Sequence, residues 1–190
     1  MIRKVVLLIA SAGLFAAATS LAMAQQMDTR AVTGFGPQFF GSASPIPRTT
    51  VYFPENYAPG TIVINTAERR LYLVQGNGQA LRYGIGVGRD GFRWSGVHHI
   101  SAKKEWPSWT PPREMLARRP DLPRHMQGGI ENPLGARAMY LGSTLYRIHG
   151  SNEPETIGQA VSSGCFRMTN DDVTDLYSRV SVGALVIVKN

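Results

Sequence analysis

The stretch TIVINTAERRLYLVQGNGQALRYGIGV, residues 61–87, decides the fold, because it repeats a pattern of short strands and turns. Runs of β-branched and apolar residues at 61–65, 71–74 and 81–87 favour β-strands, and polar or glycine-rich residues separate them. The tripeptide Gly-Asn-Gly at 76–78 supplies the positive φ angles that a tight hairpin needs. These features predict a β-meander at the start of a domain that is mainly β.

Further strands are expected downstream. The strand-like runs lie at 98–104, 139–141, 144–148 and 184–188. Between the second and the third of them, Gly142-Ser143 is expected to form a two-residue hairpin turn. The number of strands predicts a β-dominated domain with few helices.

One regular helix is expected near the end of the chain. Thr169 or Asn170 caps it, and Asp171 and Asp172 follow at its positive end. Its core-facing stripe has helical spacing and consists of Val173, Leu176, Tyr177 and Val180. We expect this stripe to pack against the sheet.

Residues 105–136 interrupt the pattern, because prolines, glycines and tryptophans prevent long regular elements there. Only 113–118 is expected to form a short helix. An irregular insertion of about 30 residues inside a compact β domain is more often functional than accidental, so we expect a lid or a wall of a substrate pocket. Trp106 and Trp109 are candidates either to stack on a sugar or peptide or to anchor the insertion.

Residues 1–24 have the layout of a secretory signal peptide. A basic start at Arg3 and Lys4 precedes an uncharged apolar run, and Ala22 and Ala24 supply small residues at the cleavage site. The run is too short to span a bilayer comfortably, and an uncleaved N-terminal anchor is the alternative. The mature protein is therefore expected to be exported, with no transmembrane segment after cleavage.

The mature chain is expected to contain a flexible lead-in, residues 25–58, followed by one domain, residues 59–190. The lead-in is rich in Gly, Pro, Ser and Thr and shows little periodicity. Its aromatic residues indicate that part of it lies on the domain.

Composition excludes several classes of protein. An apolar content of 43% excludes global disorder, and a single cysteine excludes an intramolecular disulfide and a multi-cysteine zinc site. The net charge is +7, which loss of Arg3 and Lys4 lowers to +5. The basic residues are scattered, so no nucleic-acid partner is expected. A mild affinity for anionic envelope polymers and a plain solvated surface are the two interpretations left open.

Cys165 is the first candidate for chemistry. A lone cysteine in an exported protein is either a small buried hydrophobe or a reactive thiol. Gly164 lets the backbone approach a ligand, and Arg167 can lower a thiol pKa or bind an anionic substrate. The segment leads into the predicted helix, so backbone N–H groups are available for an oxyanion hole. These neighbours favour the reactive thiol.

A cysteine nucleophile needs a base, and the chain has four histidines. His98 and His99 are adjacent on a predicted strand and point to opposite faces, and His125 lies in the insertion. His149 ends a predicted strand 16 positions before Cys165. That span is long enough to fold back and bring imidazole and thiol within hydrogen-bond reach.

The segment from 149 to 168 resembles the signature of the L,D-transpeptidase family, with its YkuD-type catalytic domain. The resemblance is carried by HGSN at 149–152, IG at 157–158 and SGCFRM at 163–168. Further segments in the family's order lie at 60–65, 70–74, 86–89, 94–96, 106–112 and 132–137, so the resemblance covers residues 59–188. Many members have a second histidine at the position of Ser163 and an asparagine at that of Arg167. The version here resembles a large Gram-negative branch.

The resemblance implies a β-sandwich of mixed sheets with a few short helices, and a cysteine mechanism without a metal or cofactor. Cys165 is the implied nucleophile and His149 the general base, and the backbone carbonyl of Gly150 orients the imidazole. The implied oxyanion and substrate-binding residues are Gly164, Ser163 and Arg167. Arg167 is expected either to pair with a substrate carboxylate or to be structural.

The implied reaction joins peptidoglycan stem peptides. Cys165 attacks the carbonyl of the third residue of a tetrapeptide stem, D-alanine leaves, and an amine of a neighbouring stem resolves the thioester into a 3→3 cross-link. Water as acceptor makes an L,D-carboxypeptidase, and an amine of an envelope protein makes an anchoring enzyme; the sequence leaves these open. A wall-binding module with an idle Cys165 is disfavoured, because nucleophile, base and glycines are all present. The expected location is the periplasm of a Gram-negative envelope, and the expected state is a monomer.

Overall fold

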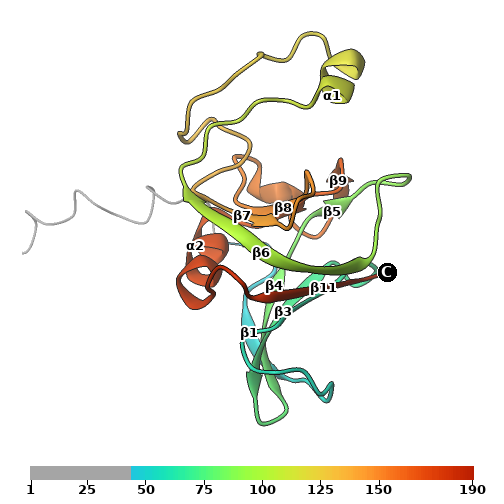
Figure 1. Ribbon diagram of the computed structural model, residues 1–190, viewed down its shortest axis with the longest axis vertical. Helices are drawn as coiled ribbons and strands as arrows, with labels where there is room; N and C mark the ends of the chain where they lie inside the picture. The colour runs from blue at the N-terminus through green and yellow to red at the C-terminus, as the bar shows by residue number, and fades with distance from the viewer. Residues whose placement is uncertain (1–43) are drawn as a thin grey trace, which may run out of the picture. The chain divides into compact units, whose positions relative to one another are not determined.

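A nine-stranded mixed sheet forms the body of the domain in the computed structural model, which describes residues 44–190 (Figure 1). The strand order is β1-β4-β3-β2-β11-β6-β7-β8-β10. The bounds are β1 (Thr49–Tyr52), β2 (Ile62–Asn65), β3 (Arg70–Gly76), β4 (Gln79–Gly84), β6 (Gly96–Glu105), β7 (Arg137–Leu141), β8 (Arg147–His149), β10 (Phe166–Arg167) and β11 (Leu185–Lys189). Two further strands, β5 (Val87–Gly88) and β9 (Ala160–Ser162), form a separate parallel pair. The pairs β2–β11 and β8–β10 are parallel, and the other pairs of the large sheet are antiparallel.

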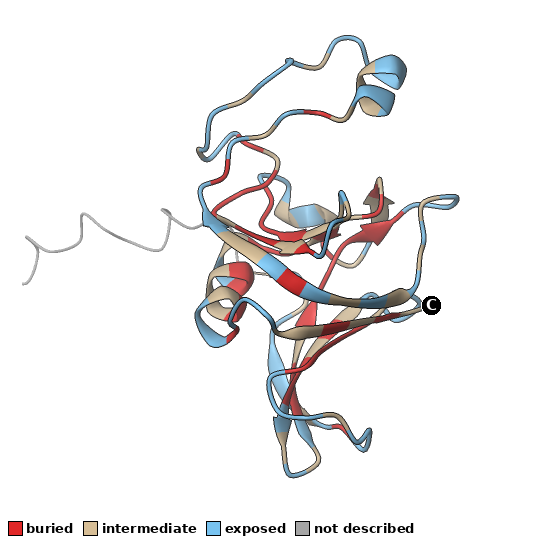
Figure 2. Cartoon of the chain, in the orientation of Figure 1, coloured by how far each residue is buried: buried red, intermediate tan, exposed pale blue. Residues whose placement is uncertain are grey.

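The sheet is shared between two halves at β6, its longest strand. The first residues of β6 pair with β11 and the later ones pair with β7, with a register irregularity between Ile100 and Ala102. Side chains from both halves meet in one core, which includes Ile64, Tyr83, Ile100, Met139, Ile148, Phe166, Leu176 and Val186. Buried residues follow the strands, whereas the insertion is mostly exposed (Figure 2). The prediction of a mainly β sandwich with mixed sheets and few helices is confirmed.

The predicted meander is present as β2, β3 and β4. Asn77 and Gly78 join β3 to β4 with φ angles of 52° and 68°. Positive φ at both turn residues matches the right-handed twist of the flanking strands. The predicted positive φ angles of the hairpin turn are therefore confirmed, and a register irregularity lies just before the turn, between Val74 and Gly76.

The predicted turn at Gly142-Ser143 is present, since the Thr144 N–H donates to the Leu141 carbonyl at 3.1 Å. The prediction that these two residues alone join the strands is wrong. β8 begins only at Arg147, so the connection is a longer loop over residues 142–146. The hydroxyl of Thr144 donates to the Leu141 carbonyl at 2.7 Å, and this side-chain bond stabilises the wider loop.

The prediction of a flexible lead-in is wrong for the end of that segment. Residues Thr49–Tyr52 form β1, which pairs with β4 at the edge of the sheet. Phe53, which follows, is 7% exposed, in line with the aromatic residues expected to lie on the domain. The predicted signal peptide, residues 1–24, and the rest of the lead-in up to residue 43 lie outside the described residues.

Two contacts fasten the residues before β1. Ile46 packs so closely on Gly84 and Gly158 that an added Cβ would lie 2.6 Å and 2.7 Å from its side chain. The guanidinium of Arg48 lies 3.1 Å from the carboxylate of Asp172. These are contacts between distant parts of the chain, so the composition of the segment does not reveal them.

The described residues include the helices α1 (Arg113–Arg118) and α2 (Asn170–Arg179) and the 3₁₀ helix η3 (Pro154–Thr156). α1 spans the residues predicted for it. Thr169 caps α2, because its hydroxyl accepts the Asp172 N–H at 3.2 Å. In this part of the chain, no helix has the length and apolar character needed to cross a bilayer.

Candidate active site

The parallel pair β8–β10 sets the geometry of the candidate site. Its register joins Ile148 to Phe166 and His149 to Arg167. Ile148 and Phe166 are buried in the core, so the alternate residues face the opposite side. We call these alternate residues the outer set: Arg147, His149, Cys165 and Arg167. The predicted base and the predicted nucleophile therefore share one face, on neighbouring strands.

His149 is a buried imidazole with a fixed orientation. It is 5% exposed, and its Nδ1 lies 2.6 Å from the Gly150 carbonyl oxygen. Because a carbonyl only accepts, Nδ1 carries the proton and Nε2 keeps its lone pair. Burial, with the charge of Arg167 as a second cause, lowers the pKa of His149 to about 3. At neutral pH the imidazole is therefore uncharged, and Nε2 can accept a proton.

Cys165 precedes β10, and its thiol points toward the loop before β8. The sulfur donates to the Leu145 carbonyl at 3.8 Å rather than to His149. Burial raises the pKa of the Cys165 thiol, and the positive charge of Arg147 opposes this effect. Cys165 and His149 are diagonal neighbours on one face of this parallel pair, and we expect rotation of the cysteine side chain to bring the thiol toward the imidazole. The resting site holds a neutral thiol near a neutral imidazole.

The resting thiol should react slowly with iodoacetamide at neutral pH. Because the pKa of Cys165 is raised, less thiolate is present at a given pH than in a free cysteine. The alkylation rate should therefore rise only above the pKa of an ordinary thiol. A pH series read by intact mass, with glutathione as reference, measures this. A midpoint at or below that of glutathione would contradict the neutral resting pair.

The loop that carries the cysteine is held by two aromatic rings. The indole Nε1 of Trp94 donates to the Gly164 carbonyl at 2.8 Å. The Trp94 ring stacks on Tyr146 with centroids 4.4 Å apart. Gly164 has a φ of 107°, and an added Cβ would overlap the Tyr146 ring. The backbone before Cys165 is therefore pressed against an aromatic platform that only glycine fits.

The hydroxyl of Ser162 closes the same loop from inside. It accepts the Gly164 N–H at 3.1 Å and donates to the Cys165 carbonyl at 2.6 Å. The Gly164 N–H, expected to belong to an oxyanion hole, is thus used within the protein. Among residues 44–190, no protein group accepts the N–H of Cys165. Ser163 lies half-buried between these residues.

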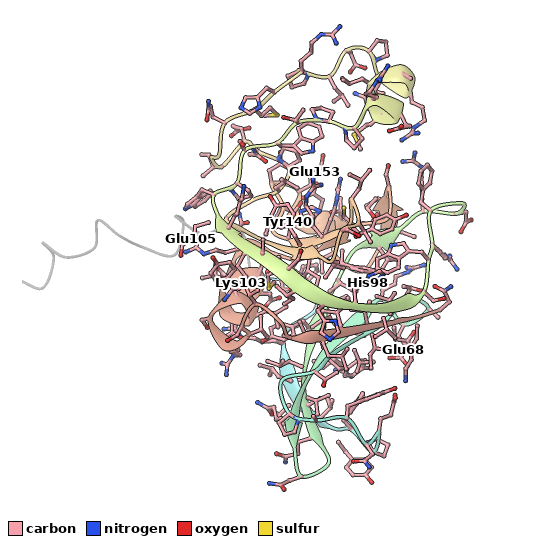
Figure 3. All side chains as sticks on the ribbon, in the orientation of Figure 1. Glu68, His98, Lys103, Glu105, Tyr140 and Glu153 are labelled. Carbon is pink, nitrogen blue, oxygen red and sulfur yellow. The ribbon has the colours of Figure 1, made fainter. Side chains whose placement is uncertain are left out.

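Arg167 is engaged by the protein itself. Its Nη1 lies 2.7 Å from Glu153 Oε2 and 3.4 Å from the Thr156 hydroxyl. Glu153 precedes η3 and lies on the side of the sheet that faces the insertion (Figure 3). The Arg167 backbone also exchanges two hydrogen bonds of 2.9 Å with Gly86. These contacts favour the structural alternative for Arg167.

The insertion leaves the sheet at the end of β6 and returns at β7 (Figure 1). At its base, the side-chain amide of Asn132 donates to the carbonyls of Pro107 at 3.2 Å and Gln127 at 2.9 Å. Trp109 and Met126 exchange two backbone hydrogen bonds of 2.8 Å. Trp109 thus lies where the two arms of the insertion are joined.

A second contact joins the insertion to the loop after β5. The guanidinium of Arg118, on α1, lies 5.2 Å from the centre of the Phe92 ring. Arg89 lies 4.5 Å from the same centre. Such cation–π contacts contribute about 0.5–1 kcal/mol each at exposed sites. This placement suits the expected lid or pocket wall, which stays a prediction.

The other histidines are not in the outer set. His98 packs edge-on against Trp94 with centroids 5.4 Å apart, and His99 is exposed. His125 Nδ1 lies 3.1 Å from the Thr110 hydroxyl within the insertion.

Sequence reasoning missed four residues of the site: Arg147, Tyr146, Trp94 and Ser162. Strand alternation alone places Arg147 on the face of His149, because the two are separated by one residue. Nothing in the local sequence pairs Trp94 with Tyr146. Trp94 lies before β6 and Tyr146 lies before β8, so only the folded arrangement of the strands brings their rings together.

Comparison with known proteins places these residues in a family context. The family model of the L,D-transpeptidase catalytic domain, YkuD, matches residues 59–188. The probable L,D-transpeptidase ErfK/SrfK of Escherichia coli (strain K12) is 38% identical over 155 residues, which are 77% of this chain and 48% of that protein. The probable L,D-transpeptidase YbiS of the same strain is 35% identical over 182 residues, 90% of this chain and 58% of that protein. The chain spans about half the length of the curated relatives it matches.

Solved structures share the fold. A Brucella melitensis protein named a probable carnitine operon oxidoreductase is 48% identical, with a TM-score of 0.52, over 75% of this chain and 92% of that chain. An L,D-transpeptidase from Mycobacterium smegmatis is 18% identical, with a TM-score of 0.55, over 68% of this chain and 58% of that chain. At such low identity the second likeness shows the fold alone.

Proposed function

We infer the function from the family, because this chain belongs to the L,D-transpeptidase catalytic domains. We propose that it transfers acyl groups between peptidoglycan stem peptides through a thioester at Cys165. The observation that carries the proposal is the shared face of β8 and β10. It holds Cys165 together with a neutral His149 whose tautomer the Gly150 carbonyl fixes.

In the proposed acylation, the thiol of Cys165 gives its proton to Nε2 of His149, and the sulfur attacks the carbonyl carbon of the third stem residue. Because the pKa of Cys165 is raised and that of His149 is lowered, a resting ion pair is disfavoured. Proton transfer and attack are therefore expected to occur together. The C–N bond then breaks, and the imidazolium returns the proton to the amine of the leaving D-alanine.

The tetrahedral intermediate needs a donor for its oxyanion. The Cys165 N–H is the group we assign, since the Gly164 N–H already donates to Ser162. In the second step an amine of a neighbouring stem attacks the thioester, and His149 accepts its proton. The C–S bond breaks, the proton returns to sulfur, and a 3→3 cross-link remains.

The acceptor defines the finer function. An L,D-carboxypeptidase uses water, and a protein-anchoring enzyme uses an amine of an envelope protein, with the same acyl-enzyme. We propose the stem peptide as acceptor, because the family's name describes transfer between peptides. The periplasm is the proposed location and a monomer the proposed state.

The purified protein should convert disaccharide tetrapeptides into cross-linked dimers that have lost one D-alanine. Mass spectrometry of the products separates the alternatives, since tripeptides without dimers indicate hydrolysis. Adding an envelope lipoprotein as a competing amine tests the anchoring reaction. If neither dimers nor tripeptides form, the acyl-transfer proposal is wrong.

Trapping of the acyl-enzyme gives a second readout. Mycobacterium tuberculosis L,D-transpeptidase 3 is described in complex with a faropenem-derived adduct. We expect a carbapenem to acylate Cys165, since the β-lactam carbonyl stands in for the stem carbonyl.

A further inference from the structure

Two cationic side chains, Lys104 and Arg147, come from the strands on either side of Tyr140, and together these three residues form a row across the sheet that ends beside Cys165. Tyr140 on β7 pairs with Arg147 on β8. The Tyr140 ring has the Lys104 ammonium 5.8 Å from its centre and the Arg147 guanidinium 5.3 Å from it. Tyr140 lies on the side of the sheet toward the insertion (Figure 3). We call Lys104, Tyr140 and Arg147 the cationic row.

Arg147 is the member of the row closest to the chemistry. The register of β8 and β10 puts Cys165 beside it, one residue before the pair Ile148–Phe166. Both side chains belong to the outer set, and the thiol points toward Leu145, on the same side of His149 as Arg147. The guanidinium therefore lies next to the sulfur and on the opposite side from Arg167.

The charge of Arg147 is not committed to a carboxylate among residues 44–190. In contrast, Arg167 pairs with Glu153 and Arg137 with Glu105. The Nε of Arg147 is buried without a hydrogen-bond partner in the described part of the chain. A buried donor without an acceptor is costly. A planar guanidinium is best satisfied by a carboxylate, which it binds through two parallel hydrogen bonds.

The leaving group of the proposed reaction carries such a carboxylate. When a terminal amino acid leaves, its carboxylate is three bonds from the carbonyl carbon that the sulfur attacks. We propose that Arg147 binds this terminal carboxylate of the acyl donor, and so selects donors whose scissile residue is the last one. The proposal rests on the proposed function and names a specificity residue for it. A donor that continues beyond this residue offers an amide there and loses the contact.

Two donors that differ only at this group test the proposal. A tetrapeptide ending in a free carboxylate should have a higher kcat/KM than the same tetrapeptide ending in a carboxamide. Arg147→Gln should reduce this preference about tenfold, the value of one charge-assisted contact, and Arg147→Lys should keep part of it. Arg70→Gln, at an arginine on β3, is the matched control. An unchanged preference in Arg147→Gln overturns the proposal.

Alkylation of Cys165 gives a readout that does not depend on peptidoglycan chemistry. Iodoacetate carries a carboxylate next to the reacting carbon, and iodoacetamide carries a neutral amide in its place. The ratio of the two rates cancels the thiolate fraction, and it should fall about tenfold in Arg147→Gln. If both rates fall equally, Arg147 acts only on the thiol pKa, and the carboxylate site is refuted. If the wild type shows the expected alkylation ratio but turns over neither donor, the proposed function is wrong, whereas the carboxylate site at Arg147 is still supported.

Discussion

Replacing Cys165 by serine should lower the turnover of tetrapeptide donors at least roughly a thousandfold. A serine hydroxyl fits the space of the thiol but is a far weaker acid, and burial lowers the pKa of His149, which makes it a weaker base toward such a group. The measurement is the formation of tripeptide and dimer by mass spectrometry. The same protein incubated with a carbapenem should show no increase in mass.

His149→Gln is the companion of that variant. Glutamine can still donate to the Gly150 carbonyl but offers no basic nitrogen, so the fold should persist while turnover falls. Circular dichroism and thermal unfolding serve as controls for both variants. Turnover near the wild-type level in Cys165→Ser would overturn the nucleophile assignment.

Gly164→Ala should destabilise the domain by roughly 2–4 kcal/mol and nearly abolish activity. The φ of 107° is strained for any residue with a Cβ, and the new methyl group would overlap the Tyr146 ring. Relief requires the loop to move, which displaces Cys165 from its place beside β8. Chemical denaturation measures the loss of stability, and alkylation measures the exposure of the thiol.

Ser163→Ala is the matched control for this variant, because Ser163 is the neighbouring loop residue and is half-buried. It should leave stability almost unchanged. Equal losses of stability in both variants would show that the platform of Trp94 and Tyr146 does not hold the loop.

Local signals predicted much of the fold. The β3–β4 hairpin follows from its Asn-Gly turn, and α1 and the Thr169 cap of α2 follow from short-range patterns. β1 was missed because its four residues become a strand only by pairing with β4, about 30 positions away. The β7–β8 loop is longer than predicted, since the N–H and the hydroxyl of Thr144 both donate to the Leu141 carbonyl and β8 begins only at Arg147.

The candidate site divides in the same way. His149 and Cys165 stand in short motifs, and the pairing of β8 with β10 brings these motifs to one face. The commitment of the Gly164 N–H to Ser162, and of Arg167 to Glu153, depends on side-chain rotamers that no motif specifies. Arg147 was within reach of strand alternation, but its free charge is a property of the folded surroundings.

The packing of residues 44–52 against the domain determines where a recombinant fragment can begin. The family match begins at residue 59, yet β1 covers the outer edge of β4 and Ile46 fills the space beside Gly84. A fragment that starts at 59 would leave a row of unpaired backbone groups on β4, a template for self-association. The folding unit is therefore longer than the segment that the family model matches, and recombinant fragments should begin before residue 44.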